Sequence, residues 1–547
     1  KYTTNVPLFE GIHIFKANKI VIEKLKKQKK LLTSGELVHQ YPHSWRSKAP
    51  LVHRATLQWF ISMESHGLRD KALKAIDETK FYPSKGKERL KSMIELRPDW
   101  CVSRQRVWGV PIPVFISKKT NEVLLDDEVT ENVANIFEKE GADCWFDEDG
   151  QRFLGKKYKS EDYEKLSDIV EVWFDSGSTH AYVLEKRKDL QWPASMYLEG
   201  SDQHRGWFHS SLLESCGTRG RAPFNSILSH GFVVDGKGLK MSKSLGNIIS
   251  PEDILKKYGA DILRIWVAAS DYAEDLRIDH SILEQHAESY RKIRNTFRYI
   301  LGNLNDKFQK VNFEKTDTAE FPELEQYMLH KIFALNSKFN KYFELYNFHS
   351  LYKDLLNFCT LDLSAFYFNI RKDVLYCDPT DSIKRKSAIK FLNIILEILL
   401  RWFAPILSFT SEEIYSLIKT DTNKSIHLEK FSDIPSKWHN NNLSNKWIEL
   451  IKIREICNSS IELKRASKEI GSSLEANLTI NLSDKLIELT KGIDFSELCI
   501  TSGAIIEKMT NNEKNQSETV IVKTIKAEGQ KCPICWKINI NQCERHS

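Results

Sequence analysis

The sequence predicts an α/β domain, a helical domain and a smaller α/β module within one chain of 547 residues. Three patterns support this. Short β-branched and aromatic runs alternate with helical stretches and glycine turns over residues 54–280. Glycine and proline then become rare, and helical periodicity dominates residues 281–440. A mixed pattern returns over residues 441–530, and the chain is long enough for several hydrophobic cores.

The first 53 residues hold a lysine-rich segment and a proline-containing loop. A helix is expected between Lys19 and Leu32, and the loop contains Pro42 and Pro50. Two stretches rich in asparagine and lysine, near 436–446 and 510–517, are expected to be exposed linkers or loops.

Helical spacing is clear after residue 281. Apolar side chains recur at i, i+4, i+7 and i+8, namely Ile293, Phe297, Ile300 and Leu301. The apolar run from Phe391 to Leu407 is interrupted by Glu397 and Arg401, so it predicts a buried helix and not a membrane span, which needs about 20 apolar residues.

Composition restricts the class of protein. The 80 basic and 74 acidic residues leave a net charge of only +6, so any nucleic-acid surface must come from local clusters of charge. Most of the ten cysteines are scattered singly, which is typical of reduced thiols in a cytoplasmic protein.

Two lysines lie three residues apart in a glycine-rich loop. Lys240 and Lys243 offer mobile ammonium groups, and Gly236, Gly238 and Gly246 allow positive φ angles and close approach to a ligand. This pattern suits a polyphosphate such as ATP. A solvated basic turn is the alternative interpretation of these few residues.

Polar residues follow a predicted strand at Glu199. The carboxyl ends of strands are where open α/β sheets bind ligands, and carboxylates there can anchor ribose hydroxyls or an ammonium group. Ser201, Asp202 and His204 could instead suggest a hydrolytic triad, but the sequence has no nucleophile elbow to support one.

Two further side-chain sets allow alternative interpretations. Trp173 and Trp207 are rigid apolar walls that suit an aliphatic ligand, although buried tryptophan more commonly packs a core. A basic stripe of Arg291, Arg294 and Arg298 is either a solvated helix face or a surface for nucleic-acid phosphates.

The last residues have the spacing of a metal site. Cys532-x-x-Cys535 and Cys543-x-x-His546 offer three thiolates and one imidazole, a ligand set that tetrahedral Zn²⁺ accepts.

These motifs occur in an order that resembles the second half of a class I aminoacyl-tRNA synthetase, and most closely the isoleucine-specific members of that family. The resemblance extends over the length of the chain. It rests on residues 41–46 (YPHSWR), 54–60 (RATLQWF), 100–113 (WCVSRQRVWGVPIP), 172–178 (VWFDSGS), 198–208 (LEGSDQHRGWF), the KMSKS loop at 240–244 and 532–536 (CPICW).

The resemblance implies a reaction and roles for individual residues. ATP, with Mg²⁺, and L-isoleucine would form an isoleucyl-adenylate that acylates tRNA(Ile). Lys240 and Lys243 would stabilise charge on the phosphates, and the three arginines of the basic stripe would contact tRNA. The adenylate or ATP would be bound by Glu199, Asp202, Gln203, His230, Gly231 and Lys243, and the isoleucine side chain by Trp173 and Trp207.

The resemblance also implies a domain order. Residues 1–53 would be the remnant of an editing insertion, 54–280 the second half of a Rossmann-like catalytic domain and 281–440 an all-α anticodon-binding domain. Residues 441–530 would be a small α/β module and 531–547 a zinc-binding tail. His546 stands where the family has a fourth cysteine. Ser44 and Ser47 replace cysteines of many relatives, so no zinc is expected there.

The chain starts at Lys1, and the family's His-Ile-Gly-His type motif is missing from it. We therefore expect a piece of a longer protein that is inactive and unable to edit by itself. We also expect the protein to be cytoplasmic, monomeric and not bound to a membrane. A non-catalytic tRNA-binding protein and a valine-specific synthetase are the alternatives.

Overall fold

The computed structural model describes residues 1–44, 47–53, 55–147, 149–304, 308–418, 424–509 and 519–546. Trp45, Arg46 and Arg54 of the first two motifs, and the 510–517 stretch, lie outside the described residues. The chain divides into two compact units, one of Lys1–Ile61 with Cys101–Arg104, the other of Ser62–Trp100 with Gln105–Ser547.

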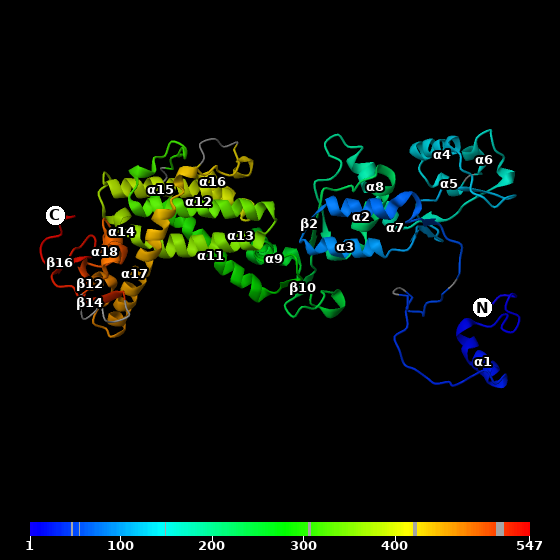
Figure 1. Ribbon diagram of the computed structural model, residues 1–547, viewed down its shortest axis with the longest axis horizontal. Helices are drawn as coiled ribbons and strands as arrows, with labels where there is room; N and C mark the ends of the chain where they lie inside the picture. Colours follow the sequence, from blue (N-terminus) through cyan, green and yellow to red (C-terminus); the bar gives the residue numbers. More distant parts are fainter. Residues whose placement is uncertain are drawn as a thin grey trace. The chain divides into compact units, whose positions relative to one another are not determined.

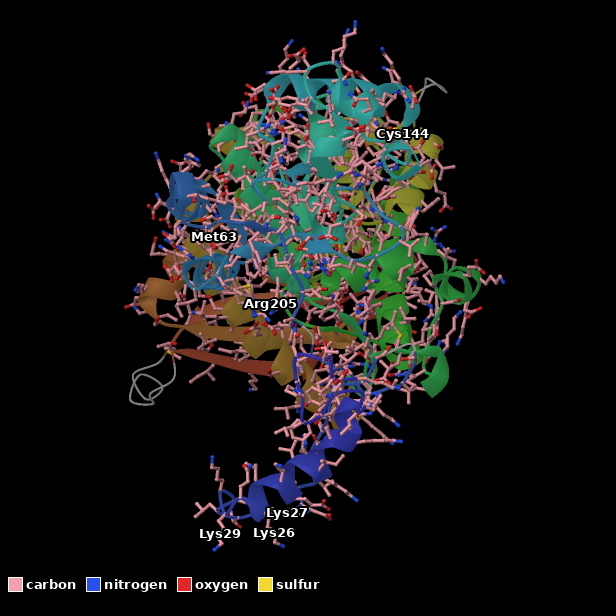
Figure 2. All side chains as sticks on the ribbon, turned by 90° about the vertical axis from the view of Figure 1, so that its right-hand side faces the viewer. Lys26, Lys27, Lys29, Met63, Cys144 and Arg205 are labelled. Carbon is pink, nitrogen blue, oxygen red and sulfur yellow. The ribbon has the colours of Figure 1, made fainter. Side chains whose placement is uncertain are left out.

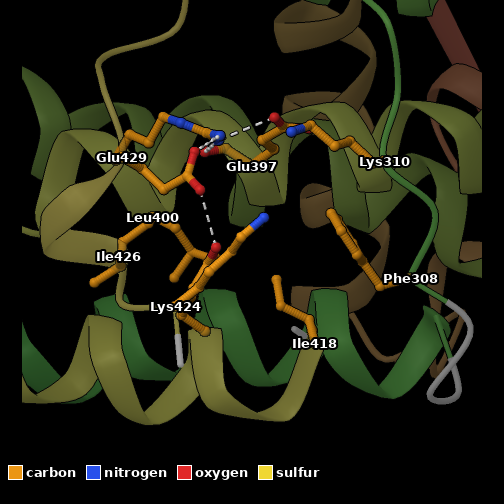
Figure 3. A pocket seen from close by; sticks show the side chains of 10 residues that line it. Phe308, Lys310, Glu397, Leu400, Ile418, Lys424, Ile426 and Glu429 are labelled. Carbon is orange, nitrogen blue, oxygen red and sulfur yellow. Dashed lines mark hydrogen bonds and ion pairs between the residues drawn. The ribbon is translucent and has the colours of Figure 1, made fainter. Parts of the chain in front are cut away.

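The first unit contains one lysine-rich helix, α1 (Ile14–Lys27), in which Ala17 is the buried residue. Lys26, Lys27 and Lys29 project from its carboxyl end (Figure 2). The helix begins and ends earlier than the segment from Lys19 to Leu32 predicted. It ends where Lys29 takes a left-handed φ of 55° and the Lys30 N–H bonds the Leu25 carbonyl at 2.9 Å, which closes the last turn.

The α/β part of the second unit is built on a parallel sheet of three strands in the order β2 (Lys80–Tyr82), β9 (Ser226–His230), β8 (Tyr197–Gly200). Most of β9 is buried, as expected for the central strand of a covered parallel sheet. The neighbouring helices are α2 (Leu68–Glu78), α3 (Lys85–Glu95), α7 (Val172–Gly177) and α8 (Trp207–Arg219).

A small subdomain interrupts this α/β part. An antiparallel pair, β5 (Phe115–Ser117) and β6 (Tyr163–Lys165), packs with α4 (Asp127–Glu140), α5 (Cys144–Asp147) and α6 (Gln151–Leu154) around the fully buried Trp145 and Phe153. After it, β10 (Val233–Asp235) pairs in parallel with β11 (Leu276–Ile278), and α9 (Pro251–Tyr258) and α10 (Ala260–Ala269) lie between them in the chain.

A bundle of long helices follows, as predicted. Figure 1 shows its members side by side: α11 (His280–Leu304), α12 (Glu323–Glu344), α13 (Phe348–Asn357), α14 (Asn369–Cys377), α15 (Ile383–Phe403) and α16 (Ser408–Ile418). The periodic residues Ile293, Phe297 and Ile300 are buried in α11, and α15 is the predicted buried helix. Across the described residues, no helix has both the length and the apolar content needed to cross a membrane.

The last part is a three-stranded sheet of β12 (Ala476–Leu482), β13 (Gly503–Lys508) and β14 (Val520–Lys526), packed by α17 (Asn441–Ala466) and α18 (Asp484–Thr490). Burial alternates along β12, which matches the two-residue period of a half-buried strand. One hydrophobic core extends from α9 through the bundle into this sheet.

The linker or loop predicted near 436–446 is wrong from Asn441 onwards. Residues 436–438 form a 3₁₀ turn and α17 begins at Asn441. The Asn440 side chain accepts the Leu443 N–H at 3.0 Å and caps the helix. An asparagine-rich stretch is compatible with a cap as well as with a loop, and Trp447 and Leu450, which are buried further along the helix, stabilise the helical choice.

Candidate functional site

The carboxyl end of the parallel sheet gathers several predicted ligand residues. Gly200 of β8 is in register with His230 of β9, so the residues that follow both strands lie at the same edge. A Cβ on Gly200 would lie 2.7 Å from Asp202 Oδ1 and 3.9 Å from His230 Cε1. The fold therefore brings Asp202 and His230 together beside Glu199, whose side chain is exposed.

Gln203 connects this edge to the two predicted tryptophans. Its Oε1 accepts the Trp207 N–H at 2.9 Å, and a Cβ on Gly206 would lie 2.4 Å from that oxygen and 2.9 Å from the Trp173 ring. The Trp207 ring stacks on Tyr197 at 4.0 Å and donates to the Ser176 carbonyl at 2.9 Å, so Trp207 is also a packing residue.

The lysine loop follows β10 and is shaped by Asp235 and Asn247. Asp235 Oδ1 accepts the N–H groups of Lys237 and Leu239 at 3.0 and 2.8 Å, and Asp235 Oδ2 accepts from the Asn247 amide at 2.9 Å. The bond from Asn247, and next the bond from Leu239, lower the pKa of Asp235. Asn247 Oδ1 in turn accepts the Ser242 N–H at 2.9 Å.

Lys240 and Lys243 are exposed on this loop, and neither has a carboxylate partner among the described residues. Gly238 and Gly246 have positive φ angles of 82° and 64°, as predicted. Gly236 is needed for a different reason, because a Cβ there would lie 2.2 Å from Asp279 Oδ2. The loop therefore presents two ammonium groups on a backbone fixed by hydrogen bonds.

Gly231 joins β9 to β10 and admits no side chain. Its N–H donates to the Tyr272 carbonyl at 2.9 Å, and a Cβ would lie 2.2 Å from the backbone oxygen of Glu274. This contact fixes the path of the chain between His230 and the lysine loop.

Glu214 of α8 is a buried carboxyl that the sequence did not indicate, and it packs against Gly177 of α7. Glu214 of α8 has a buried Oε1 without a hydrogen-bond partner, and that atom would lie 2.1 Å from a Cβ on Gly177. Burial, and next the charge of Asp175, raise the pKa of Glu214 to about 9. The only sequence signal is a single acidic residue among the small and apolar residues from Ser210 to Gly217.

Glu214 should make stability pH-dependent. It stays protonated in the folded chain, whereas in the unfolded chain it ionises above a pKa of about 4.3. The free energy of unfolding should therefore fall as pH rises from about 4.3 towards about 9, and this loss should be smaller in Glu214→Gln. Urea unfolding at pH 5 and pH 8 would measure it, with exposed Glu131→Gln as the control. Equal pH slopes for the wild type and Glu214→Gln would contradict this expectation.

The arginine stripe on α11 is partly occupied by ion pairs. Arg294 forms two hydrogen bonds to the Glu413 carboxylate, at 2.8 and 2.7 Å, and Arg291 pairs with Glu288. The hydrogen bonds that Arg294 donates to Glu413, the largest cause, raise the pKa of Arg294. Arg298 is exposed.

The four predicted metal ligands come together in the structure. Atoms of Cys532, Cys535, Cys543 and His546 that could hold an ion all lie within 4.8 Å of one another. His546 Nδ1 is 3.6 Å from Cys532 Sγ and 3.5 Å from Cys543 Sγ, and the Sγ atoms of Cys535 and Cys543 are 3.9 Å apart. Zinc–sulfur bonds of about 2.3 Å imply tetrahedral edges of about 3.8 Å, so the donor set fits Zn²⁺.

The electrostatics of this cluster favour a thiolate. Hydrogen bonds from the N–H of Cys535, which is the largest cause, and of Ile534 lower the pKa of Cys532 to about 6. Burial raises the pKa of Cys535 to about 11, which favours the protonated thiol. A bound cation would favour the thiolate instead.

Comparison with known proteins identifies the class. The family model of class I tRNA synthetases (I, L, M and V) matches residues 6–279, and the anticodon-binding domain of tRNA ligase matches residues 325–480. The chain belongs to the class I tRNA synthetases.

The similar curated proteins are isoleucine–tRNA ligases. That of Pelagibacter ubique is 73% identical over 547 residues, which are 100% of this chain and 60% of the relative. That of Brucella abortus biovar 1 is 48% identical over 533 residues, 95% of this chain and 54% of the relative. The chain thus spans about three-fifths of the length of the first of these relatives.

A solved structure shows the same fold. Mycobacterium tuberculosis methionyl-tRNA synthetase bound by methionyl-adenylate aligns with a TM-score of 0.50 and 15% sequence identity, covering 75% of this chain and 72% of that chain.

Proposed function

We propose that this chain is part of an isoleucine–tRNA ligase, which joins L-isoleucine to tRNA(Ile) through an isoleucyl-adenylate. The observation that carries the proposal is the 73% identity over the whole chain to a protein of that name. The gathered residues at the sheet edge and the exposed lysine pair support it. A valine-specific enzyme and a non-catalytic tRNA-binding protein have no comparable support.

The chemistry needs alignment and charge stabilisation and no covalent enzyme intermediate. The isoleucine carboxylate attacks the α-phosphate of ATP, pyrophosphate leaves, and the adenylate then acylates a ribose hydroxyl of the tRNA. Lys243, assisted by Lys240, would stabilise the charge that grows on the phosphates, with Mg²⁺ bound to ATP. Both lysines are exposed and available to an anionic ligand.

The sheet edge would bind the adenylate. Glu199 and Asp202 offer exposed carboxylates to ribose hydroxyls and to the isoleucine ammonium group, while His230 and Gly231 border the same edge. Gln203 accepts the Trp207 N–H at its Oε1, and its amide nitrogen donates to Asp202 Oδ2 at 3.4 Å. An amide nitrogen carries two hydrogens, so the second one would be the donor to a ligand. Trp173, which is 38% exposed, and Trp207 would form the wall for the isoleucine side chain.

The proposal is tested by ATP–pyrophosphate exchange with the enzyme that contains this chain. Isoleucine should support exchange at a higher kcat/KM than valine, because the tryptophan wall would contact the additional methylene of isoleucine. Higher kcat/KM with valine would contradict the substrate assignment, and no exchange with either amino acid would contradict the reaction. Cytoplasmic location and a monomeric state stay predictions.

We also propose that Cys532, Cys535, Cys543 and His546 hold one Zn²⁺. The ion would supply no chemistry to adenylate formation and would hold the tail together. Metal analysis of the purified chain should find about one zinc per chain, and the double variant Cys532→Ser, Cys535→Ser should lose it. The double variant Cys101→Ser, Cys144→Ser, at cysteines remote in sequence, is the control. No zinc under reducing conditions would contradict the site.

Arg291, Arg294 and Arg298 remain proposed tRNA contacts. Arg298 is the best placed of the three, because Arg291 and Arg294 would have to exchange a carboxylate for a phosphate.

A further inference from the structure

The segment that carries the metal ligands rests on a helix of the bundle. Arg545 Nε donates to Asp378 Oδ1 at 2.5 Å, and the same guanidinium pairs with Asp373. Asp373 lies in α14, and Asp378 follows its last residue. The three side chains are 10–26% exposed, so this ion pair is partly shielded from water.

His546 touches the metal site and α14 with its two ring nitrogens. Nδ1 faces the thiols of Cys532 and Cys543, while Nε2 is 2.9 Å from the carbonyl oxygen of Cys377, the last residue of α14. A carbonyl can only accept, so this contact requires a proton on Nε2. A neutral imidazole that binds a metal through Nδ1 has its proton on Nε2, so the contact with the carbonyl is compatible with metal bound at Nδ1.

The other side of the segment is attached to the C-terminal module. The strands β15 (Gln530–Lys531) and β16 (Ile538–Asn539) form an antiparallel pair. The N–H of Ile538 in β16 donates to Oγ of Ser502, the residue before β13, at 2.7 Å. The Cys377 thiol, which is half-buried, also donates to the Ile534 carbonyl at 3.6 Å, so the first Cys-x-x-Cys turn contacts this thiol. The metal ligands thus lie between the module and the bundle.

We propose that metal binding and docking of residues 532–546 on α14 are linked, with Arg545 and the Cys377 carbonyl positioning His546 for the metal. The inference rests on the proposed zinc site. Bound metal would raise the equilibrium constant for docking of the segment on α14. Docking would raise the metal affinity by the same factor, because coupling between two equilibria is reciprocal. Since α14 lies within the residues matched by the anticodon-binding family, the metal would fix this segment against that domain.

The test uses the whole chain and the variants Arg545→Ala and Asp373→Asn. The control is Arg465→Ala, which removes an exposed arginine paired with Glu462 on α17. Zinc affinity is measured by competition with a chromogenic chelator. Alkylation of Cys377 by N-ethylmaleimide is followed by peptide mass spectrometry, with and without zinc, and Cys144 serves as the internal standard.

Both variants should still bind one zinc at saturation but about tenfold more weakly, as is typical for loss of a group that orients a ligand. Alkylation of Cys377 should accelerate when zinc is removed from the wild type, and in both variants with zinc bound. The rate of Cys144 labelling should be the same with and without zinc. The Arg465→Ala variant should keep the zinc affinity and the Cys377 labelling rate of the wild type. Bound zinc with wild-type affinity and unchanged Cys377 labelling in both variants would overturn the linkage and leave the metal site intact. Absence of bound zinc in the wild type would overturn both.

Discussion

Replacing Lys243 by alanine in the enzyme that contains this chain is expected to lower the kcat of isoleucine-dependent ATP–pyrophosphate exchange by about 10²–10³-fold, the usual cost of removing one group that stabilises charge in a transition state. The ammonium group is exposed and has no carboxylate partner among the described residues, so its removal should leave the fold intact. The KM for isoleucine should change little, because that side chain would contact the sheet edge and tryptophan wall instead.

Lys237→Ala is the matched control for this measurement. Lys237 is an exposed lysine of the same loop, and only its backbone N–H contributes to the turn, by donating to Asp235. Its replacement should leave kcat within a factor of two to three. Equal activities of Lys243→Ala and the wild type would refute the proposed role of Lys243. Equal losses in both variants would mean that total loop charge, and not the position of Lys243, is what matters.

Arg371→Ala is expected to destabilise the chain by roughly 3–5 kcal/mol, the range found when one partner of a buried ion pair is removed. Arg371 is 3% exposed, and its guanidinium holds both oxygens of the fully buried Glu325 at 2.6 and 2.7 Å. It also pairs with Glu497 of α19 (Phe495–Leu498). Removal would leave the buried Glu325 without a cation, although Tyr367 still donates to it at 2.9 Å. Glu497 would keep its pair with Lys384 at 2.6 Å.

The measurement is urea unfolding followed by circular dichroism, with Arg291→Ala as the control. Arg291 forms an exposed pair with Glu288 one turn away, and such pairs contribute about 0–1 kcal/mol. Because Arg371 connects α12 and α14 with α19, the loss should appear as a lower midpoint for the bundle and the C-terminal module together. A midpoint equal to that of Arg291→Ala would show that the buried network contributes no more than a surface pair.

Local sequence was sufficient for much of the fold. The spacing of Ile293, Phe297 and Ile300 identified α11, because burial of one helix face demands a period of 3.6 residues. The spacing of Cys532, Cys535, Cys543 and His546 likewise predicted that these side chains form one cluster, since short spacings place both members of a pair in one turn. Helix ends were predicted less well. Lys29 ends α1 through a left-handed φ that lysine seldom adopts, and Asn440 caps a helix where a linker was expected.

The contacts between distant segments were not readable from the sequence. Asp202 and His230 both lie next to Gly200 because β8 and β9 pair in parallel register. Arg294 pairs with Glu413, and Arg545 pairs with Asp373, although more than a hundred residues of chain separate the partners in each pair. Glu214 was missed because burial, which raises its pKa, depends on how α7 packs on α8.

The sequence by itself determined the residue types, the class of protein and the local periods, since these depend on side-chain chemistry and on spacing along a few turns. Only the tertiary structure decided which side chains share an edge, which charges neutralise one another and that His546 faces a cluster of cysteine thiols with one nitrogen and α14 with the other. The physical reason is that register, burial and ion pairing are set by the packing of whole elements, and single positions carry no signal of their distant partners.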